Sequence, residues 1–216
     1  MPQWFENPPP CRTRRGEARR QRLLDAAAEV FMEQGYAGAS VNEIVRRAGG
    51  SMSTLYRLFG SKLGLFEAMI AQRTEAVFAP FEADGVWTDD VEASLLAYGR
   101  HIQSRLVEGD AVEIFRLVVS ERGEDRERIQ SFFYDAGPRR GQRLLADYLR
   151  TQVEKGRLRA MDCDMAACQF IDMTRAPFYY RLLFGDPPGQ AERERALQQA
   201  LALFLHGARA FREGPV

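Results

Sequence analysis

The sequence contains few of the side chains from which catalytic and metal sites are built. Its 216 residues include two histidines, His101 and His206, and three cysteines, Cys11, Cys163 and Cys168. An odd number of cysteines without a Cys-x-x-Cys pair argues against a disulfide framework and against a zinc site. The sequence also lacks Gly-x-Ser-x-Gly, His-Glu-x-x-His and phosphate-loop motifs. We therefore expect a protein that is not an enzyme and that binds neither a metal nor another cofactor.

Long hydrophobic runs are absent as well. No segment approaches the roughly 18 consecutive apolar residues of a transmembrane helix, and the N-terminal segment lacks the apolar core of a signal peptide. The composition, with 45% hydrophobic and 28% charged residues, is typical of a globular protein. We therefore expect a cytoplasmic protein that does not interact with a membrane.

The formal net charge is zero, but the charge is unevenly distributed. Residues 1–62 contain 10 Lys and Arg against 6 Asp and Glu, whereas residues 63–216 contain 20 against 24. The N-terminal part therefore has a net charge of +4 and the remainder a net charge of −4. This distribution favours contact between a polyanion and the N-terminal part alone.

Helical periodicity runs through nearly the whole sequence, without the alternation typical of β-strands, and predicts an all-α fold. Residues 1–16 are rich in proline and then in arginine, and we expect a flexible basic arm there. Glycine and proline separate the predicted helices, and Pro177 predicts a kink within one of them. Two short helices are expected within residues 39–62, and the other expected helices cover residues 19–34, 61–83, 88–107, 110–122, 125–136, 139–155, 163–184 and 190–212.

Residues 39–62, ASVNEIVRRAGGSMSTLYRLFGSK, contain two serines in helix-starting positions. Ser40 and Glu43 form a capping box, in which the serine side chain accepts from the Glu43 amide and the glutamate reaches back. Gly49 follows the first short helix, at a position that favours a left-handed conformation. Ser51 is the predicted N-cap of the second short helix.

The second short helix has about two turns and is not stable alone, so neighbouring helices must hold it. Leu55 and Phe59 mark its buried side. Its more exposed residues are Met52, Ser53, Thr54, Tyr56 and Arg57. A helix that supports a second helix is the arrangement of helix-turn-helix DNA binding.

The alternative interpretation is three ordinary core helices joined by tight turns. The basic arm ahead of the first expected helix favours DNA binding, because its arginines could follow backbone phosphates or a minor groove. These residues are Arg12, Arg14, Arg15, Arg19, Arg20 and Arg22.

Residues 17–77 resemble the DNA-binding domain of the TetR (tetracycline-repressor) family of regulators. The residues that carry the resemblance are Gly35-Tyr36, Ser40, Ile44-Val45, Ala48-Gly49-Gly50-Ser51, Ser53, Leu55-Tyr56, Phe59 and Lys62. The sequence departs from the family pattern at Gly50, where the family has an apolar residue. It departs again at Leu58, where the family often has histidine or an aromatic residue.

The resemblance implies DNA-binding roles for this N-terminal domain. The implied phosphate contacts are Ser40, Ser51, Tyr56 and Lys62. The residues implied to face base edges or adjacent phosphates are Met52, Ser53, Thr54 and Arg57. Arg46 and Arg47 would contact the DNA backbone from the supporting helix, with a solvated helix face as the alternative.

Residues 78–216 resemble the family in helical layout and in Gly156-Arg157-Leu158 followed by Asp164 and Ala166-Ala167. The resemblance implies a domain that dimerises and encloses a pocket for a small-molecule effector. An ordinary core uses the same residue types, so both interpretations stay open for each pocket candidate, including His101. The candidates are Tyr98, His101, Ile102, Phe115, Arg116, Phe133, Phe170, Met173, Thr174 and Phe178.

The last helix carries an apolar, small-residue stripe that packs either on its own domain or on a second subunit. Paired with the helix over residues 139–155, it would form a four-helix dimer interface. The interface candidates are Leu145, Tyr148, Leu149, Leu197, Leu201 and Phe204. A two-fold axis would require a pseudo-palindromic DNA operator.

The sequence as a whole predicts a dimeric, ligand-responsive DNA-binding transcriptional regulator. In the resembled family such a protein is most often a repressor that an effector releases from its operator. The alternative is a helical interaction protein whose DNA-binding domain has degenerated at Gly50 and Leu58.

Overall fold

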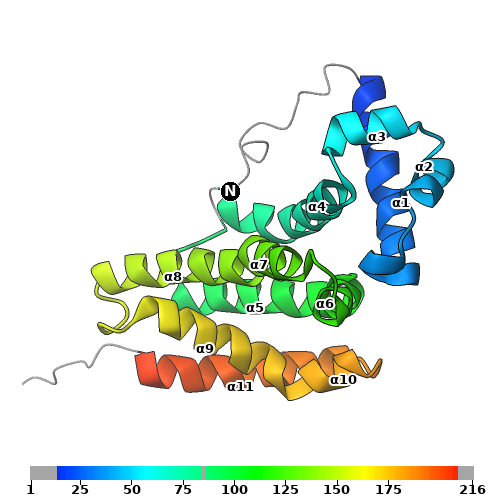
Figure 1. The fold of residues 1–216 in the computed structure, drawn as a ribbon. Coiled ribbons are helices and arrows are strands. Elements are labelled where there is room, and N and C mark those ends of the chain that lie inside the picture. The colour runs from blue at the N-terminus through cyan, green and yellow to red at the C-terminus, as the bar shows by residue number, and fades with distance from the viewer. Residues whose placement is uncertain (1–13, 84–85, 209–216) are drawn as a thin grey trace, which may run out of the picture. The chain divides into compact units, whose positions relative to one another are not determined.

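The computed structural model describes residues 14–83 and 86–208. These residues are almost entirely helical, and no β-sheet forms among them, which confirms the all-α prediction. The helices are α1 (Arg14–Gly38), α2 (Val41–Ala48), α3 (Met52–Phe59), α4 (Lys62–Glu82), α5 (Val91–Glu108), α6 (Ala111–Ser120), α7 (Arg126–Ala136), α8 (Pro138–Glu154), α9 (Cys163–Arg175), α10 (Tyr179–Leu183) and α11 (Gln190–Ala208) (Figure 1).

Helix α1 is longer than expected at both ends. It begins at Arg14, so the last three residues of the expected arm are helical, while residues 1–13 lie outside the described residues. Gly35 interrupts the helix with a φ of 72° and a ψ of 165°, which fits the predicted stop. One further turn follows and ends at Gly38.

The kink expected at Pro177 is a break between two helices. Helix α9 ends at Arg175, a 3₁₀ turn covers Ala176–Phe178, and α10 follows directly. Proline has no backbone N–H and cannot continue the hydrogen-bond ladder of an α-helix, which accounts for the break.

The chain divides into two compact units that do not follow the expected boundary at residue 77. Of the described residues, the first unit comprises those up to Arg73 together with Leu117–Phe133, and the second comprises those within Thr74–Arg116 and those from Tyr134 onward. Helices α4, α6 and α7 therefore each contribute to both units. Sequence periodicity did not indicate that residues 117–133 belong with the N-terminal helices.

The first unit has a core of apolar side chains from α1 to α4. Leu23 and Val30 of α1 are fully buried, as are Ile44 of α2 and Leu55 of α3. An aromatic cluster joins the end of α1 to α4. Its members are Phe31, Tyr36 and Phe66, with ring centroids 5.0 to 5.8 Å apart. Edge and offset contacts of this kind stabilise an aromatic core beyond simple burial.

The second unit has its core among α5, α8, α9 and α11. Leu95, Leu145 and Phe170 are fully buried there. Gly99 of α5 lets α11 approach closely, since a Cβ at that position would overlap Leu197. The main helix contacts of this unit are those of α8 with α9 and those of α11 with α5 and with α9. Helix α11 therefore packs inside its own unit.

Candidate nucleic-acid interface

Helices α2 and α3 begin and end as predicted. The Ser40 Oγ accepts from the Glu43 amide at 3.5 Å, and the Ser51 Oγ accepts from the Thr54 amide at 3.3 Å. Gly49 has a φ of 62° and a ψ of 41°, the left-handed conformation expected after α2. These local signals place α3 as a separate helix after a tight turn.

The outward face of α2 is rich in ion pairs. Glu43 accepts from Arg46 at 2.6 Å and from Arg47 at 2.8 Å, whereas the capping box had predicted that it reaches back to Ser40. The two arginines lower the pKa of Glu43 to about 2. Arg47 also binds Glu33 of α1 at 2.7 Å, and its side chain is 26% exposed. Arg47 therefore joins α2 to α1.

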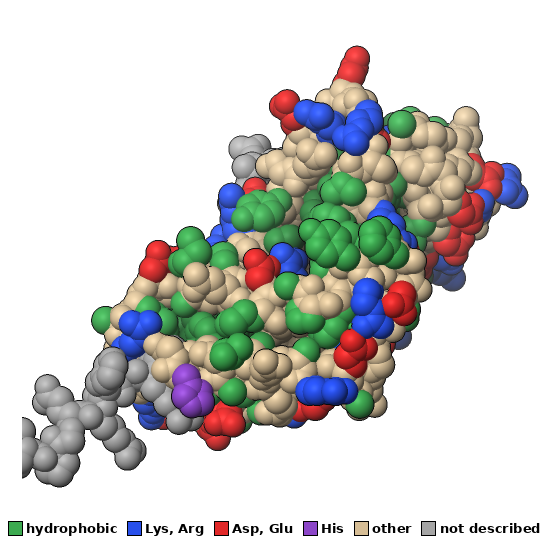
Figure 2. Space-filling model, turned by 90° about the horizontal axis from the view of Figure 1, so that it is seen from below, with side chains coloured by type: hydrophobic (Ala, Val, Ile, Leu, Met, Phe, Trp, Pro, Cys, Tyr) green, Lys and Arg blue, Asp and Glu red, His purple; other side chains and the backbone are tan. Residues whose placement is uncertain are grey.

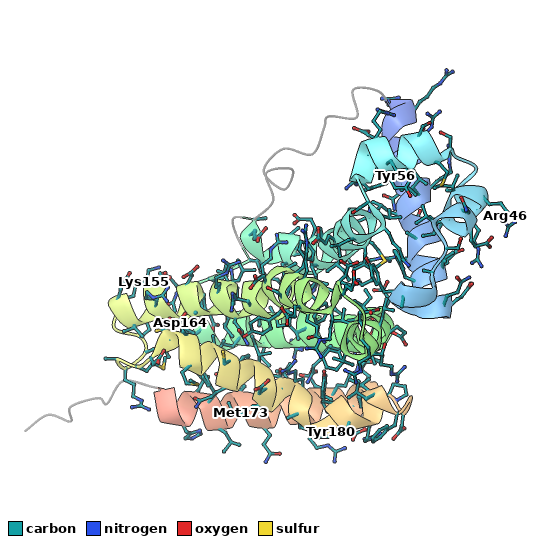
Figure 3. All side chains as sticks on the ribbon, viewed as in Figure 1. Arg46, Tyr56, Lys155, Asp164, Met173 and Tyr180 are labelled. Carbon is teal, nitrogen blue, oxygen red and sulfur yellow. The ribbon has the colours of Figure 1, made fainter. Side chains whose placement is uncertain are left out.

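Arg46 lies further out than Arg47. Its side chain is 72% exposed and extends away from α2 at the edge of the first unit (Figure 3). Among the described residues its ion-pair partner is Glu43, and a pair with so exposed an arginine contributes little to stability. Arg46 is therefore accessible to a phosphate.

The outward face of α3 is formed by Ser53, Tyr56 and Arg57, which are exposed, and by the half-exposed Met52. The Tyr56 side chain is labelled in Figure 3, and the residue is 47% exposed. The expectation that Thr54 is exposed was wrong, because only 8% of its surface is accessible. Its hydroxyl accepts from Ser51 at 3.0 Å, which turns it toward the cap.

Helix α4 begins at Ser61-Lys62, as predicted. The Ser61 Oγ accepts from the Gly64 amide at 3.0 Å and caps the helix. The Lys62 Nζ donates to the Ala37 carbonyl at 3.1 Å. Burial lowers the pKa of Lys62, and the nearby carboxylates of Glu121 and Asp125 oppose this shift.

The candidate effector residues of the second unit lie in several places. Tyr98 is buried and donates from its hydroxyl to the Gly141 carbonyl at 2.9 Å. The His101 Nε2 lies 2.8 Å from the Val77 carbonyl, so His101 has a hydrogen-bond partner at the rim of the core. Tyr98 and His101 both pack against Phe81, with ring centroids 4.9 and 5.1 Å away.

The other candidates divide between the core and the surface. Phe170 and Thr174 are buried, and Ile102 packs against the core. Arg116 donates to the Leu182 and Leu183 carbonyls near α10, and Phe115 contacts Tyr179 with ring centroids 5.7 Å apart. Phe133 belongs to the other unit. Met173 and Phe178 line a surface groove.

The groove is open, has a volume of about 610 Å³ and lies between α11 and the segment that joins α9 to α10. Its lining residues are Met173, Pro177, Phe178, Glu192, Arg195, Ala196, Gln199, Ala200 and Leu203. Figure 2, which views the molecule from the α11 side, shows hydrophobic side chains gathered on this face. Leu203 is 62% exposed and Met165 of α9 is 54% exposed. Contiguous exposed apolar side chains are a common feature of contact surfaces.

The candidate dimer residues do not lie on this surface. Leu145, Tyr148 and Leu149 of α8 are at most 6% exposed, and Leu197, Leu201 and Phe204 of α11 are at most 8% exposed. All six belong to the core of the second unit, because the stripe on α11 faces α5 and α9. Leu203 lies between Leu201 and Phe204 in the sequence and is a large apolar residue of α11 that is exposed, at 62%.

In the described part of the chain, no group of three or more His, Cys, Asp or Glu side chains is arranged to hold a metal ion. Across the same residues, none of the helices combines the length and the hydropathy needed to cross a membrane.

Comparison with known proteins identifies both parts of the chain. Residues 23–69 match the family model of bacterial regulatory proteins of the tetR family. Residues 93–207, more than half of the chain, match the C-terminal domain of AefR-like transcriptional repressors. The chain belongs to the TetR family of transcriptional regulators. Members of this family bind DNA and regulate transcription, which confirms the prediction of a DNA-binding regulator rather than an enzyme.

Similar proteins cover nearly the whole length of this TetR-family chain. An uncharacterized HTH-type transcriptional regulator of Bacillus subtilis, YvkB, is 28% identical over 88% of this chain and 97% of its own length. The flavonoid-responsive regulator FrrA has a similar structure, with a TM-score of 0.78 and 24% identity over 90% of this chain and 98% of its own. The regulator FadR of Bacillus subtilis, solved with stearoyl-CoA, has a TM-score of 0.63 and 17% identity over 87% of this chain and 98% of its own.

Proposed function

We propose that this TetR-family regulator is a homodimeric repressor that a small-molecule effector releases from a pseudo-palindromic operator. The observation that supports DNA reading most directly is α3, a capped two-turn helix whose outward side chains Ser53, Tyr56 and Arg57 are exposed. The match of the C-terminal part to AefR-like repressors supports repression. Such a protein would act on the chromosome, in the cytoplasm.

The proposed DNA contacts follow the exposed residues of α2 and α3. Phosphates would be bound by Ser40, Ser51 and Tyr56, with Arg46 adding a contact from the supporting helix. Base edges or adjacent phosphates would be contacted by Met52, Ser53 and Arg57. Thr54 is too buried to face bases, so we assign it to support of the cap.

The proposed dimer interface is the apolar surface around the groove between α11 and the segment that joins α9 to α10, together with the neighbouring Met165 of α9. Leu203 and Met165 would become buried against a second copy, and the two-fold axis would place two α3 helices on successive turns of one face of the DNA. This surface replaces the six buried residues of α8 and α11 that the sequence had suggested.

The dimer proposal is tested by Leu203→Glu, which places a charge in the apolar surface. We expect a monomer by light scattering and a loss of operator affinity of at least tenfold, since one half-site alone must then hold the protein. Ala97→Glu adds the same charge at an exposed position of α5 and serves as the control. A Leu203→Glu protein that remains a dimer would contradict the proposed surface.

The proposed effector is a small organic molecule with an apolar portion. The second unit is rich in aromatic side chains, and similar folds include a flavonoid-responsive regulator and one that binds stearoyl-CoA. Binding of effector and operator would be reciprocally coupled, so the effector would weaken DNA binding only by its differential affinity for the two states.

The proposed function is tested by selecting duplexes from a random DNA pool with the full-length protein. We expect an inverted repeat whose affinity falls steeply with salt, and a footprint of two half-sites about one helical turn apart or a multiple of it. If no salt-sensitive duplex is selected, the alternative of a helical interaction protein with a degenerate DNA-binding domain is supported instead.

A further inference from the structure

Arg105, in the last turn of α5, is a half-buried arginine whose charge has no partner within the described part of the chain. Its Nε is buried and has no hydrogen-bond partner there, and no described carboxylate forms an ion pair with its guanidinium. A buried donor without an acceptor costs free energy, and a charged donor costs more. Such a group points to a role other than stabilising the fold.

The other half-buried arginines of the second unit differ from Arg105 in this respect. Each of them bonds a carboxylate or a backbone carbonyl. They are Arg116, Arg140, Arg175, Arg181 and Arg193. Arg193 also has an unpaired Nε, but its terminal nitrogens lie 3.4 Å from the Glu108 carboxylate. Arg105 is therefore the exception among these side chains.

Glu108, one turn further along α5, is committed to other donors. The Ser104 hydroxyl donates to Glu108 at 2.7 Å, and Arg193 of α11 lies 3.4 Å away. The Ser104 bond, and then the charges of Arg193 and Arg105, hold the pKa of Glu108 below its usual value. Two guanidiniums thus share the field of one carboxylate, which leaves an excess of positive charge among these side chains.

The helix dipole alone does not account for this arrangement. A cation in the last turn of α5 is favoured by the partial negative charge of the helix end. An arginine directed into solvent would serve that purpose and keep its Nε in water. The Nε of Arg105 instead is buried and donates to no carbonyl of that turn.

The position of Arg105 on α5 places it in line with aromatic side chains. Residues four and seven apart lie on one face of a helix, so Arg105 shares a face with His101 and Tyr98. His101 bonds a carbonyl of α4 and Tyr98 bonds a carbonyl of α8, so this face is directed toward these two helices. Phe81 of α4 packs against both rings, with centroids 5.1 and 4.9 Å away. An unpaired cation therefore follows an aromatic strip formed by Phe81, Tyr98 and His101.

We propose that the effector is an aromatic carboxylic acid and that Arg105 binds its carboxylate. The Nε and a terminal nitrogen of a guanidinium form a fork that matches the two oxygens of a carboxylate. The side chain turns on binding, because protein atoms cover its Nε in the free protein. The ring of the acid lies along the face of α5 that carries Tyr98 and His101. The proposal rests on the proposed function in that the protein must respond to an effector, and it names the chemical class of that effector.

The test compares two ligands of the same shape that differ in charge, 2-naphthoate and 2-naphthamide. Isothermal titration calorimetry measures the Kd of each with the full-length protein in the absence of DNA. We expect the wild-type protein to bind the acid about tenfold to a hundredfold more tightly than the amide, the scale of a hydrogen bond to a charged group. Equal affinities for the two ligands, or no binding of the acid, would overturn the proposal.

Variants of Arg105 assign the preference to this side chain. Arg105→Met removes the charge and keeps an apolar stem, and we expect it to bind 2-naphthoate no more tightly than 2-naphthamide. Arg105→Lys keeps the charge without the planar fork and should retain part of the preference. Arg100→Met is the control, because Arg100 lies on the same helix and pairs with Glu194. It should keep the wild-type preference, and a preference that survives in Arg105→Met would contradict the assignment.

The stability of the free protein gives a second readout that needs no ligand. Arg105→Met removes an unpaired, half-buried cation and should leave the free energy of unfolding unchanged or raise it. Arg140→Met breaks ion pairs with Glu75 and Glu82 and should lower it. Urea unfolding measures the free energy of unfolding of both variants. A loss in Arg105→Met as large as that in Arg140→Met would show that Arg105 has a structural partner, against the proposal.

These outcomes are distinct from a failure of the proposed function. Binding of the acid is measured without DNA, whereas the proposed function fails when the wild-type protein selects no salt-sensitive duplex from the random pool. A protein that selects a duplex but binds both ligands equally is a DNA-binding regulator whose effector is not an aromatic acid.

Discussion

Helices α2 and α3 have the same length and the same kind of cap, but their outward faces differ in chemistry. Each has eight residues and follows an N-cap serine. On α2 both Arg46 and Arg47 bind carboxylates of their own unit. On α3 Arg57 is exposed and forms no ion pair with the described residues. The number of arginines is therefore a poor guide to the helix that we propose reads DNA, because Arg47 is held within the unit at 26% exposure while Arg46 stays 72% exposed.

The largest effect that separates the two helices is expected from their arginines. Arg57→Met should lower operator affinity about tenfold to a hundredfold and flatten its salt dependence, as for a base or phosphate contact. Arg47→Met should instead lower the stability of the first unit, since it breaks the link from α2 to Glu33, and leave the salt slope unchanged. Fluorescence anisotropy over a series of salt concentrations measures the operator affinity and the salt slope of both variants. A reduced slope in Arg47→Met would show that α2 contacts phosphates through this residue.

A smaller effect is expected from the two adjacent glycines between the helices. Gly49→Ala forces a side chain into a φ of 62° and should lower the free energy of unfolding by about 1 kcal/mol. Gly50 does not have a positive φ, and a Cβ there would meet the Leu23 Cδ2 at an ordinary 3.7 Å. Gly50→Ala should therefore raise the free energy of unfolding by about 0.4–1 kcal/mol, because the unfolded chain loses freedom. Urea unfolding measures the free energy of unfolding of both variants. Equal losses in Gly49→Ala and Gly50→Ala would contradict the predicted difference between the two glycines.

The turn also bears on how firmly α3 is oriented relative to α2. Gly50→Val restores the apolar side chain of the family pattern, and the space beside Leu23 accepts its Cβ. We expect a stiffer turn and operator binding that is tighter by about twofold to fivefold, the scale of a loop substitution that reduces backbone freedom. Weaker binding would mean that the native turn requires glycine at this position.

The smallest effect concerns the pH dependence of the ion pairs on α2. The folded state lowers the pKa of Glu43 from 4.5 to about 2, so its ionised form stabilises the fold above pH 4.5. This contribution is lost as the pH falls from 4.5 to about 2. Glu43→Gln should therefore show a smaller loss of thermal stability than the wild-type protein between these pH values. Parallel acid-unfolding curves for the two proteins would contradict the assignment.

Local features of this chain were predictable from the sequence, and long-range packing was not. The caps at Ser40 and Ser51 and the left-handed Gly49 depend on a few neighbouring residues, and the structure confirms them. Thr54 was misplaced because its side chain bonds to the cap of Ser51 while its neighbours face outward.

The second half of the chain shows the limit of periodicity more clearly. A helical stripe such as Leu197 and Leu201 identifies a face that is buried, but it does not identify the partner that buries it. Here the partners are α5 and α9 of the same chain. In the same way, nothing in residues 117–133 themselves indicates that Asp125 and Arg128 pair with Tyr36 and Glu67, which lie far away in sequence.

The membership of residues 117–133 in the first unit has a consequence for modularity. A DNA-binding domain cut from this chain near residue 77 would lack Asp125 and Arg128. It would leave the buried Glu67 carboxylate without its arginine. Exchange of effector domains between family members, by recombination or by design, therefore carries part of the DNA-binding unit with it. Grafted partners must match Tyr36 and Glu67, or the hybrid folds with a weakened N-terminal half.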